Sequence, residues 1–218
     1  MDDANTCSTT SAGRLRQMAP REALGTDELS QLWRVESGAL RIDSAPSGER
    51  ARFVRLALPG DVIGVERWAG TDDSLALHAL IASRLTPVHA TGEPMMQILM
   101  ETVVVGHQRC REVVSLRTGP VAKRIKALLL LFAQNPGESS PGSTVIECAV
   151  PHIADLSDIV DAAPETVSRV FGSMRDLDFL QDRRPQKACF SSQALRSLEI
   201  VAGMSAPRPH RPPLLSGA

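Results

Sequence analysis

The residues best suited to specific chemistry lie together between positions 164 and 170. Glu165, Ser168 and Arg169 supply a carboxylate, a hydroxyl and a guanidinium. Their spacing of three and four residues places them on one surface of a helix. A guanidinium can donate two hydrogen bonds to O6 and N7 of guanine, and a carboxylate can accept one from the amino group of cytosine. The trio therefore has the donors and acceptors that base edges require.

Two short helices are predicted to position this trio. In the first, from His152 to Val160, apolar residues recur at helical spacing. Residues 161–163 then form a turn, and Pro164 suits the first turn of a second helix, where its missing N–H has no partner to lose. Two short helices joined by a tight turn are typical of a helix-turn-helix, whose second helix enters the major groove. The buried face of the second helix is expected to comprise Val167, Val170, Phe171 and Met174.

The segment from Pro164 to Arg169 resembles the E-T-V-S-R recognition-helix motif of the CRP/FNR superfamily of bacterial transcription regulators. The resemblance covers about residues 32–198 and implies a dimer that reads a palindromic, TTGA-like operator through residues 164–175, as in the FNR branch. Asp161 stands where this turn usually has glycine, and aspartate tolerates the left-handed conformation better than most residues. The resemblance implies base contacts for Glu165, Ser168 and Arg169, and other DNA contacts for Pro164, Thr166, His152, Arg183, Arg184 and Lys187.

The charge pattern fits a nucleic-acid partner only locally. The 218-residue chain has a formal net charge of -1, so a DNA-binding surface needs a basic patch of its own. Residues 179–181 and 188–190 are predicted to pair as a hairpin, and its turn, residues 182–187, would bring cations to DNA phosphates. A strand over residues 144–150 is expected to lead into the helix pair. The candidate basic patch comprises Arg169, Arg175, Arg183, Arg184 and Lys187.

The first half of the chain has the pattern of short strands. Alternating residues from Leu32 to Ile42 around Gly38, a second run over residues 53–58, and a Pro-Gly-Asp turn ending at Asp61 predict a small β-roll. By resemblance, this is a cyclic-nucleotide-binding-like roll. The expected fold is α+β, with an N-terminal roll, a dimerisation helix and a C-terminal winged helix-turn-helix. Its expected parts are an irregular arm (1–27), the roll (28–92), the dimerisation helix and hinge (93–117), the DNA-binding domain (118–204) and a disordered tail (205–218).

Residues 93–116 have apolar positions at intervals of three and four. This spacing predicts a helix whose apolar face packs either into the core or against a second subunit. The resemblance implies the dimerisation helix, although it looks short for that role. Thr118 is expected to cap the next helix, with Pro120 near its start. A final helix is predicted over residues 192–202.

The expected effector pocket departs from the cyclic-AMP pattern of the family. Those binders carry a Gly-Glu pair and a later arginine for the cyclic phosphate. Here one residue separates Gly64 from Glu66, so the adjacent Gly-Glu pair is absent. Residues 70–74, where the arginine is expected, contain two aspartates and no arginine. A charge pair at about 4 Å is worth roughly 4 kcal/mol near a protein surface, so repulsion in place of attraction argues against cyclic AMP. The effector stays unknown; the candidate pocket residues are Gly64, Glu66, Arg67 and Arg84, although the two arginines also fit ordinary surface charges.

No cofactor or metal is expected. Cys7 stands alone, no two cysteines have C-x-x-C spacing, and a [4Fe–4S] cluster lacks its ligands. His107 and Cys110 can share a helix face, but a tetrahedral metal site needs more than two ligands. Packing or surface roles are therefore expected for these two residues and for His78 and His89.

No convergent nucleophile, base or metal set indicates an enzyme. The alternative is a small-molecule-binding roll, or a metal- or haem-dependent sensor or enzyme, in which the C-terminal module serves protein interaction. No signal peptide or membrane-spanning run is recognisable, which predicts a cytoplasmic protein. The expected partners are double-stranded DNA, a second copy of the chain and RNA polymerase.

Overall fold

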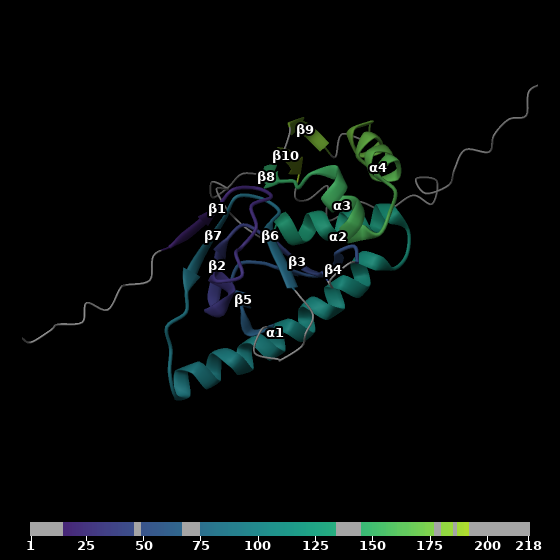
Figure 1. Cartoon of the computed structure of the whole chain (residues 1–218). Helices are drawn as coiled ribbons and strands as arrows, with labels where there is room; N and C mark the ends of the chain where they lie inside the picture. Colours follow the sequence, from purple (N-terminus) through teal and green to yellow (C-terminus); the bar gives the residue numbers. More distant parts are fainter. Residues whose placement is uncertain are drawn as a thin grey trace, which may run out of the picture.

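The computed structural model describes residues 15–45, 49–66, 75–133, 145–176, 180–184 and 187–191, with side chains described over 15–45, 49–66, 75–132 and 149–175. Ten strands, four α-helices and one short 3-10 helix follow one another in this part of the chain. No helix in these ranges is long and apolar enough to cross a membrane. The fold is α+β, with the sheets of the roll first and the helices after them (Figure 1).

The N-terminal half forms two antiparallel sheets. One contains β1 (Arg16–Met18), β7 (Ser83–Pro87), β2 (Trp33–Ser37) and β5 (Val62–Ile63), in that order. The other contains β4 (Arg52–Ala57), β3 (Leu40–Ser44) and β6 (Leu75–Ala79). Residues at alternate positions of a strand face the same side of its sheet. The apolar side chains that face inward from both sheets form one core cluster. Its members include Trp33, Val35, Leu40, Ile42, Ile63, Leu77 and Leu85.

Gly38 lets the chain leave one sheet for the other between β2 and β3. Its φ is +92°, and a Cβ there would collide with Ser83 and the carbonyl of Ala82. Only glycine accepts both the left-handed backbone and this close approach. The strand-glycine-strand pattern therefore marks a crossing between sheets.

The expectation of an irregular arm over residues 1–27 is wrong for its described part, residues 15–27. β1 pairs antiparallel with β7, with Arg16 opposite Leu85. Leu24 is 5% exposed and joins the core of the roll. Arg16 forms ion pairs with Glu22 at 2.7 Å and with Glu28, in the 3-10 helix Glu28–Ser30, at 2.8 Å. These tertiary contacts order a segment whose own sequence has little periodicity.

α1 (Glu93–Arg117) is the longest helix of the described chain, and α2 (Val121–Ala133) follows it. With 25 residues, α1 is about 37 Å long, so it is not short for a subunit seam. Thr118 does not cap α2: its hydroxyl donates to the carbonyl of Val114 at 2.8 Å, at the end of α1. The first turn of α2 instead begins at Pro120, whose carbonyl accepts from the N–H of Lys123 at 2.9 Å.

The C-terminal part contains β8 (Val145–Ala149), α3 (Ile153–Val160), α4 (Pro164–Asp176), β9 (Leu180–Arg184) and β10 (Lys187–Ser191). The three strands form a sheet in the order β8-β10-β9. The predicted hairpin is present, but its strands are longer than expected, and residues 182–184 and 187 lie in strands rather than in the turn. The predicted final helix (192–202) and tail (205–218) lie outside the described residues.

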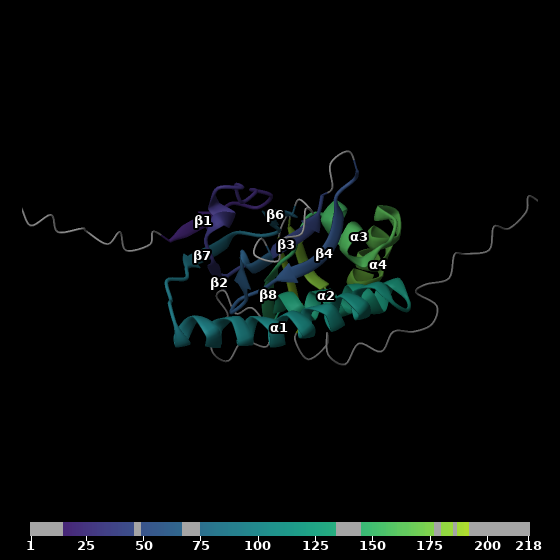
Figure 2. The ribbon, with the colours of Figure 1, turned by 60° about the horizontal axis from the view of Figure 1, so that its bottom comes forward.

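One hydrophobic cluster joins the roll to the C-terminal helices. It combines Phe53, Leu56 and Ile81 of the roll with residues of α2, α3 and α4. Figure 2 shows both parts on the same side of α1, with α1 running beneath them. Among these helical residues are Ile125, Leu129, Phe132, Leu156, Val167, Phe171 and Met174.

Candidate nucleic-acid interface

α4 has one buried and one exposed face. Val167, Val170, Phe171 and Met174 are each at most 2% exposed, as the sequence predicts. Glu165, Ser168 and Arg169 are exposed. Within the described residues, their side chains have no hydrogen-bond or ion-pair partner. Packing therefore fixes the helix while its N-terminal polar side chains stay available to a ligand.

The turn before α4 is held from two sides. Asp161 has φ +49° and ψ +62°, which is the left-handed conformation expected at this place. Arg124 of α2 donates from Nη1 to the carbonyl of Asp161 at 3.0 Å, and it also donates to the carbonyl of Val160. The N–H of Val167 donates to the carbonyl of Ala163 at 3.1 Å, so Pro164 occupies the first helical position. No local pattern indicated the part played by Arg124.

The other candidate DNA contacts fall into two groups. Pro164 is exposed, Thr166 is half-buried, and His152 is exposed at the start of α3. Ile153 of α3 lines one surface hollow together with Pro164 and the trio of α4. The candidate cations of the hairpin occupy β9 and β10: Lys187 lies opposite Arg184, and Ala188 lies opposite Arg183. Their backbones are placed at one end of the hairpin, and their side chains lie outside the described set.

A buried arginine that was not predicted from the sequence links the roll to α3. Arg41 of β3 is 4% exposed, and its Nε donates to Asp43 at 2.6 Å. Its Nη1 lies 3.4 Å from Asp158 and 3.9 Å from Asp155, both on α3. Arg117, at the end of α1, donates to the backbone carbonyl of Asp158 at 2.9 Å. The first helix of the pair is therefore anchored to both the roll and α1.

A second buried pair fixes α1 against the roll. Arg109 donates from Nε and Nη2 to the two oxygens of Asp61 at 2.8 and 2.9 Å. It also donates to both oxygens of Glu112. Burial by itself lowers the pKa of the Arg109 guanidinium, but the hydrogen bonds to Asp61 and Glu112 outweigh it and raise the pKa above its ordinary value. Asp61 was expected only as a turn residue. Its carboxylate also forms the ion pair with Arg109 that holds α1 against the turn.

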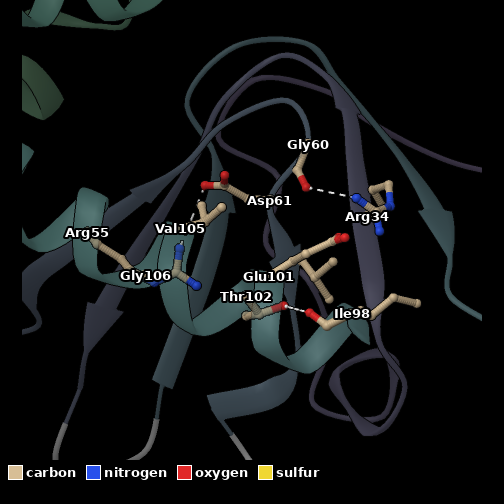
Figure 3. Close-up of a pocket in the computed structure, with 10 residues that line it drawn as sticks. Arg34, Arg55, Gly60, Asp61, Ile98, Glu101, Thr102, Val105 and Gly106 are labelled. Carbon is tan, nitrogen blue, oxygen red and sulfur yellow. Dashed lines mark hydrogen bonds and ion pairs between the residues drawn. The ribbon is translucent and has the colours of Figure 1, made fainter. Parts of the chain in front are cut away.

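A cavity of about 250 Å³ lies between α1 and the roll (Figure 3). Arg34 of β2 and Arg55 of β4 line it from the roll, and Glu101 and Thr102 line it from α1. Arg34 donates to the carbonyl of Gly60 at 3.1 Å. The cavity therefore offers both cationic and acidic groups to a small polar molecule.

The described residues of the predicted pocket do not line this cavity. Glu66 accepts from the N–H of Gly64 at 2.9 Å and forms an ion pair with Arg55. Arg84 is exposed on β7, in the first sheet, and Arg67 lies outside the described residues. The structure thus brings Gly64 and Glu66 together and leaves Arg84 apart. Arg34 and Arg55, which no sequence motif singled out, are the cations at the cavity.

The described histidines do not lie with two or more other metal-binding side chains of the same chain. Within the described residues of one chain, no cluster of three or more His, Cys, Asp or Glu residues could hold a metal ion. His78 of β6 is half-buried, with Nδ1 3.7 Å from Asp43, and His89, His107 and Cys110 are exposed. Burial lowers the pKa of His78 below its ordinary value, although Asp43 opposes the shift.

Taken together, this architecture is the fold of CRP/FNR-type transcriptional regulators. Solved structures of such regulators match most of the chain at low sequence identity. No family model matches the sequence, and no curated protein matches it.

Three solved structures illustrate the likeness. TTHB099, a CRP-family transcriptional regulator from Thermus thermophilus, has a TM-score of 0.67 at 21% identity, and the match covers 83% of this chain and 94% of that protein. FixK2 from Bradyrhizobium japonicum has a TM-score of 0.63 at 22% identity, covering 87% and 98%. CLP of Xanthomonas campestris, described as a c-di-GMP-responsive global regulator, has a TM-score of 0.58 at 17% identity, covering 83% and 95%.

Proposed function

We propose that this protein is a sequence-specific DNA-binding transcription regulator of the CRP/FNR type. In this proposal, α3 and α4 with the β8-β10-β9 sheet act as a winged helix-turn-helix, and the sheets before them act as a cyclic-nucleotide-binding-like roll. One observation carries the proposal: three polar side chains of different chemistry project, unpartnered within the described residues, from the N-terminal half of a helix whose other face is fully buried. The N-terminal residues of a recognition helix are those that reach base edges.

The chain acts as a homodimer in this proposal. Two copies of α4, one helical turn of DNA apart, read a palindromic operator with TTGA-like half-sites. Arg169 contacts guanine, Glu165 contacts a cytosine amino group, and Ser168 makes a smaller hydroxyl contact. The cations of β9 and β10 bind phosphates. The neighbouring structures that are described as CRP- or FNR-type regulators support this proposal at the level of fold.

The proposed input is a small molecule other than cyclic AMP, or no effector at all. Glu66 is paired with Arg55, so its carboxylate is engaged before a ribose arrives. The candidate chamber is instead the cavity beside Arg34 and Arg55. A calorimetric titration with cyclic AMP is expected to show no micromolar binding, and such binding would refute this part of the proposal.

Selection of binding sites from random duplex DNA by the purified full-length protein tests the function directly. The expected product is a two-fold-symmetric site whose half-sites contain a TTGA-like sequence. Footprinting of the selected site and of a scrambled site provides the control. Recovery of unselected sequences with uniform affinity would overturn sequence-specific binding, and an asymmetric site protected by one copy would overturn the dimer.

A further inference from the structure

His107 and Cys110 lie within an exposed stripe along α1. Both side chains are exposed, and within the described residues neither has a hydrogen-bond or ion-pair partner. Cys110 is a free thiol. Two groups per chain are too few for a tetrahedral metal site. The exposed stripe around the pair indicates how a second chain can bring the two missing ligands.

The stripe is apolar and has coiled-coil spacing. Its members are separated by four, three, four, three and four residues, which is the alternation of core positions in a heptad. All six are exposed: Met96, Met100, Val103, His107, Cys110 and Val114. Of the seven large hydrophobic residues that are exposed in the described chain, five lie on α1. From Met96 to Val114 the stripe is about 27 Å long, and its heptad spacing fits a partner helix of the same spacing.

A second copy of this chain is the occupant that fits the stripe. Figure 2 shows the sheets and the C-terminal helices on one side of α1, and the exposure of all six stripe residues means that no described element covers them. When two parallel helices pack about a two-fold axis, each core residue faces its own copy. His107 then faces the partner's His107, and Cys110 faces the partner's Cys110.

We propose that the dimer binds one zinc-type divalent cation on its two-fold axis through these two histidines and two cysteines. This inference rests on the homodimer of the proposed function. Two imidazoles and two thiolates form the donor set of a closed, structural zinc site. Three residues of helix place His107 and Cys110 on one face, about 4.5 Å apart along the helix axis, so that their side chains can converge on one ion. An ion on the two-fold axis therefore reaches all four groups.

The metal also resolves a conflict within the stripe. An imidazole and a thiol placed in an apolar seam lose contact with water, and polar groups buried without a partner are destabilising. Coordination gives each group a partner, and each thiol releases its proton to solvent as its sulfur binds the ion. Zinc bound only by the dimer shifts the equilibrium toward the dimer.

Metal titration of the full-length protein tests this site. The protein is stripped with a chelator, kept under a non-thiol reductant, and titrated with Zn²⁺ and with Co²⁺. Native mass spectrometry is expected to show one Zn²⁺ per dimer, and Co²⁺ is expected to give the visible absorption of tetrahedral sulfur-nitrogen coordination. The dimer dissociation constant, measured by sedimentation, is expected to fall about tenfold when free Zn²⁺ is ten times its Kd.

Matched variants assign the ligands. Cys110→Ser and His107→Asn are each expected to lose the stoichiometric metal and the effect of Zn²⁺ on dimerisation. Cys7→Ser and His89→Asn, which change the same residue types outside the stripe, are expected to keep both. Metal retained by Cys110→Ser, or one metal per chain, would overturn the site.

The same samples separate this inference from the proposed function. A metal-free dimer that selects a symmetric DNA site but binds no Zn²⁺ would overturn the zinc site alone. A protein that stays monomeric with and without Zn²⁺ and selects no DNA sequence would overturn both.

Discussion

At the scale of single residues, Arg169 is the strongest candidate for base recognition. It is exposed near the N-terminus of α4 and has no partner within the described residues. Arg169→Ala is expected to weaken binding to the selected operator by about 1–3 kcal/mol and to relax base preference at one position of each half-site. Competition binding against operators with single base changes measures this preference.

Arg175→Ala is the matched control for Arg169. Arg175 is an exposed arginine in the last turn of the same helix. Its replacement is expected to leave base preference unchanged. If Arg169→Ala weakened binding equally on every sequence, Arg169 would be a phosphate contact instead.

His78 links the stability of the fold to pH. Burial lowers its pKa below 6.5, and the opposing attraction of Asp43 at 3.7 Å does not compensate. The unfolded chain therefore binds a proton at a higher pH than the folded chain does. The stabilisation is complete above about pH 6.5 and is lost as the pH falls through the lower, folded-state pKa.

Replacement of His78 is expected to reduce this acid sensitivity. The loss of Tm between about pH 7.5 and pH 5.5 is expected to be smaller for His78→Gln than for the wild type. His89→Gln changes an exposed histidine and is expected to behave like the wild type. Equal effects of the two variants would contradict the assignment to His78.

At the scale of elements, the buried ion pair between Asp61 and Arg109 holds α1 against the roll. Asp61 is 3% exposed and Arg109 is 9% exposed, so removal of the Asp61 charge leaves the buried guanidinium with Glu112 as its remaining ion-pair partner in the described chain. Asp61→Asn is expected to lower the free energy of unfolding by about 3–5 kcal/mol, the usual effect of breaking a buried pair. Denaturant unfolding followed by circular dichroism measures the change. Asp27→Asn, at an exposed aspartate, is expected to change stability by less than about 0.5 kcal/mol.

At the scale of the whole molecule, the shared core predicts that the roll and the C-terminal helices unfold together. Phe53 is 9% exposed and belongs to the same cluster as residues of α2, α3 and α4. The guanidinium groups of Arg117 and Arg41 lie 5.4 and 5.8 Å from the centroid of its ring.

Phe53→Ala is expected to destabilise the protein by about 3–5 kcal/mol while a single cooperative transition is kept. Calorimetry measures both quantities. Val54→Ala, at the exposed neighbouring position, is expected to have a small effect. Two separate transitions in the wild type would show that the shared cluster does not couple the two parts.

The apolar stripe of α1 gives a prediction for the assembly. Val103 is 68% exposed in the single chain, and a carboxylate at its position would be buried in the proposed seam. Val103→Glu is expected to convert the dimer to a monomer in sedimentation experiments and to abolish binding to a palindromic site. Val54→Glu, at an exposed valine of β4, is expected to leave the dimer intact.

Local features of this protein were determined by the sequence itself. The period of apolar residues in α3 and α4 fixes which side of each helix is buried, so the exposure of Glu165, Ser168 and Arg169 follows from spacing alone. Pro164 at the first helical position follows from the fixed backbone of proline. The left-handed turn at Asp161 was implied by the family resemblance, and aspartate tolerates that conformation. The short strands of the roll follow from alternation interrupted by glycine and proline.

Contacts between distant segments were decided only by the tertiary structure. Arg109 and Asp61 are 48 residues apart, and Arg41 and Asp158 are 117 apart. The sequence shows that each residue is charged but not which opposite charge the fold brings beside it. The same holds for β1, since a short strand of low periodicity is stabilised by its partner β7 rather than by its own sequence. Burial of these charges depends on the packing of several elements at once, and no local pattern records that packing.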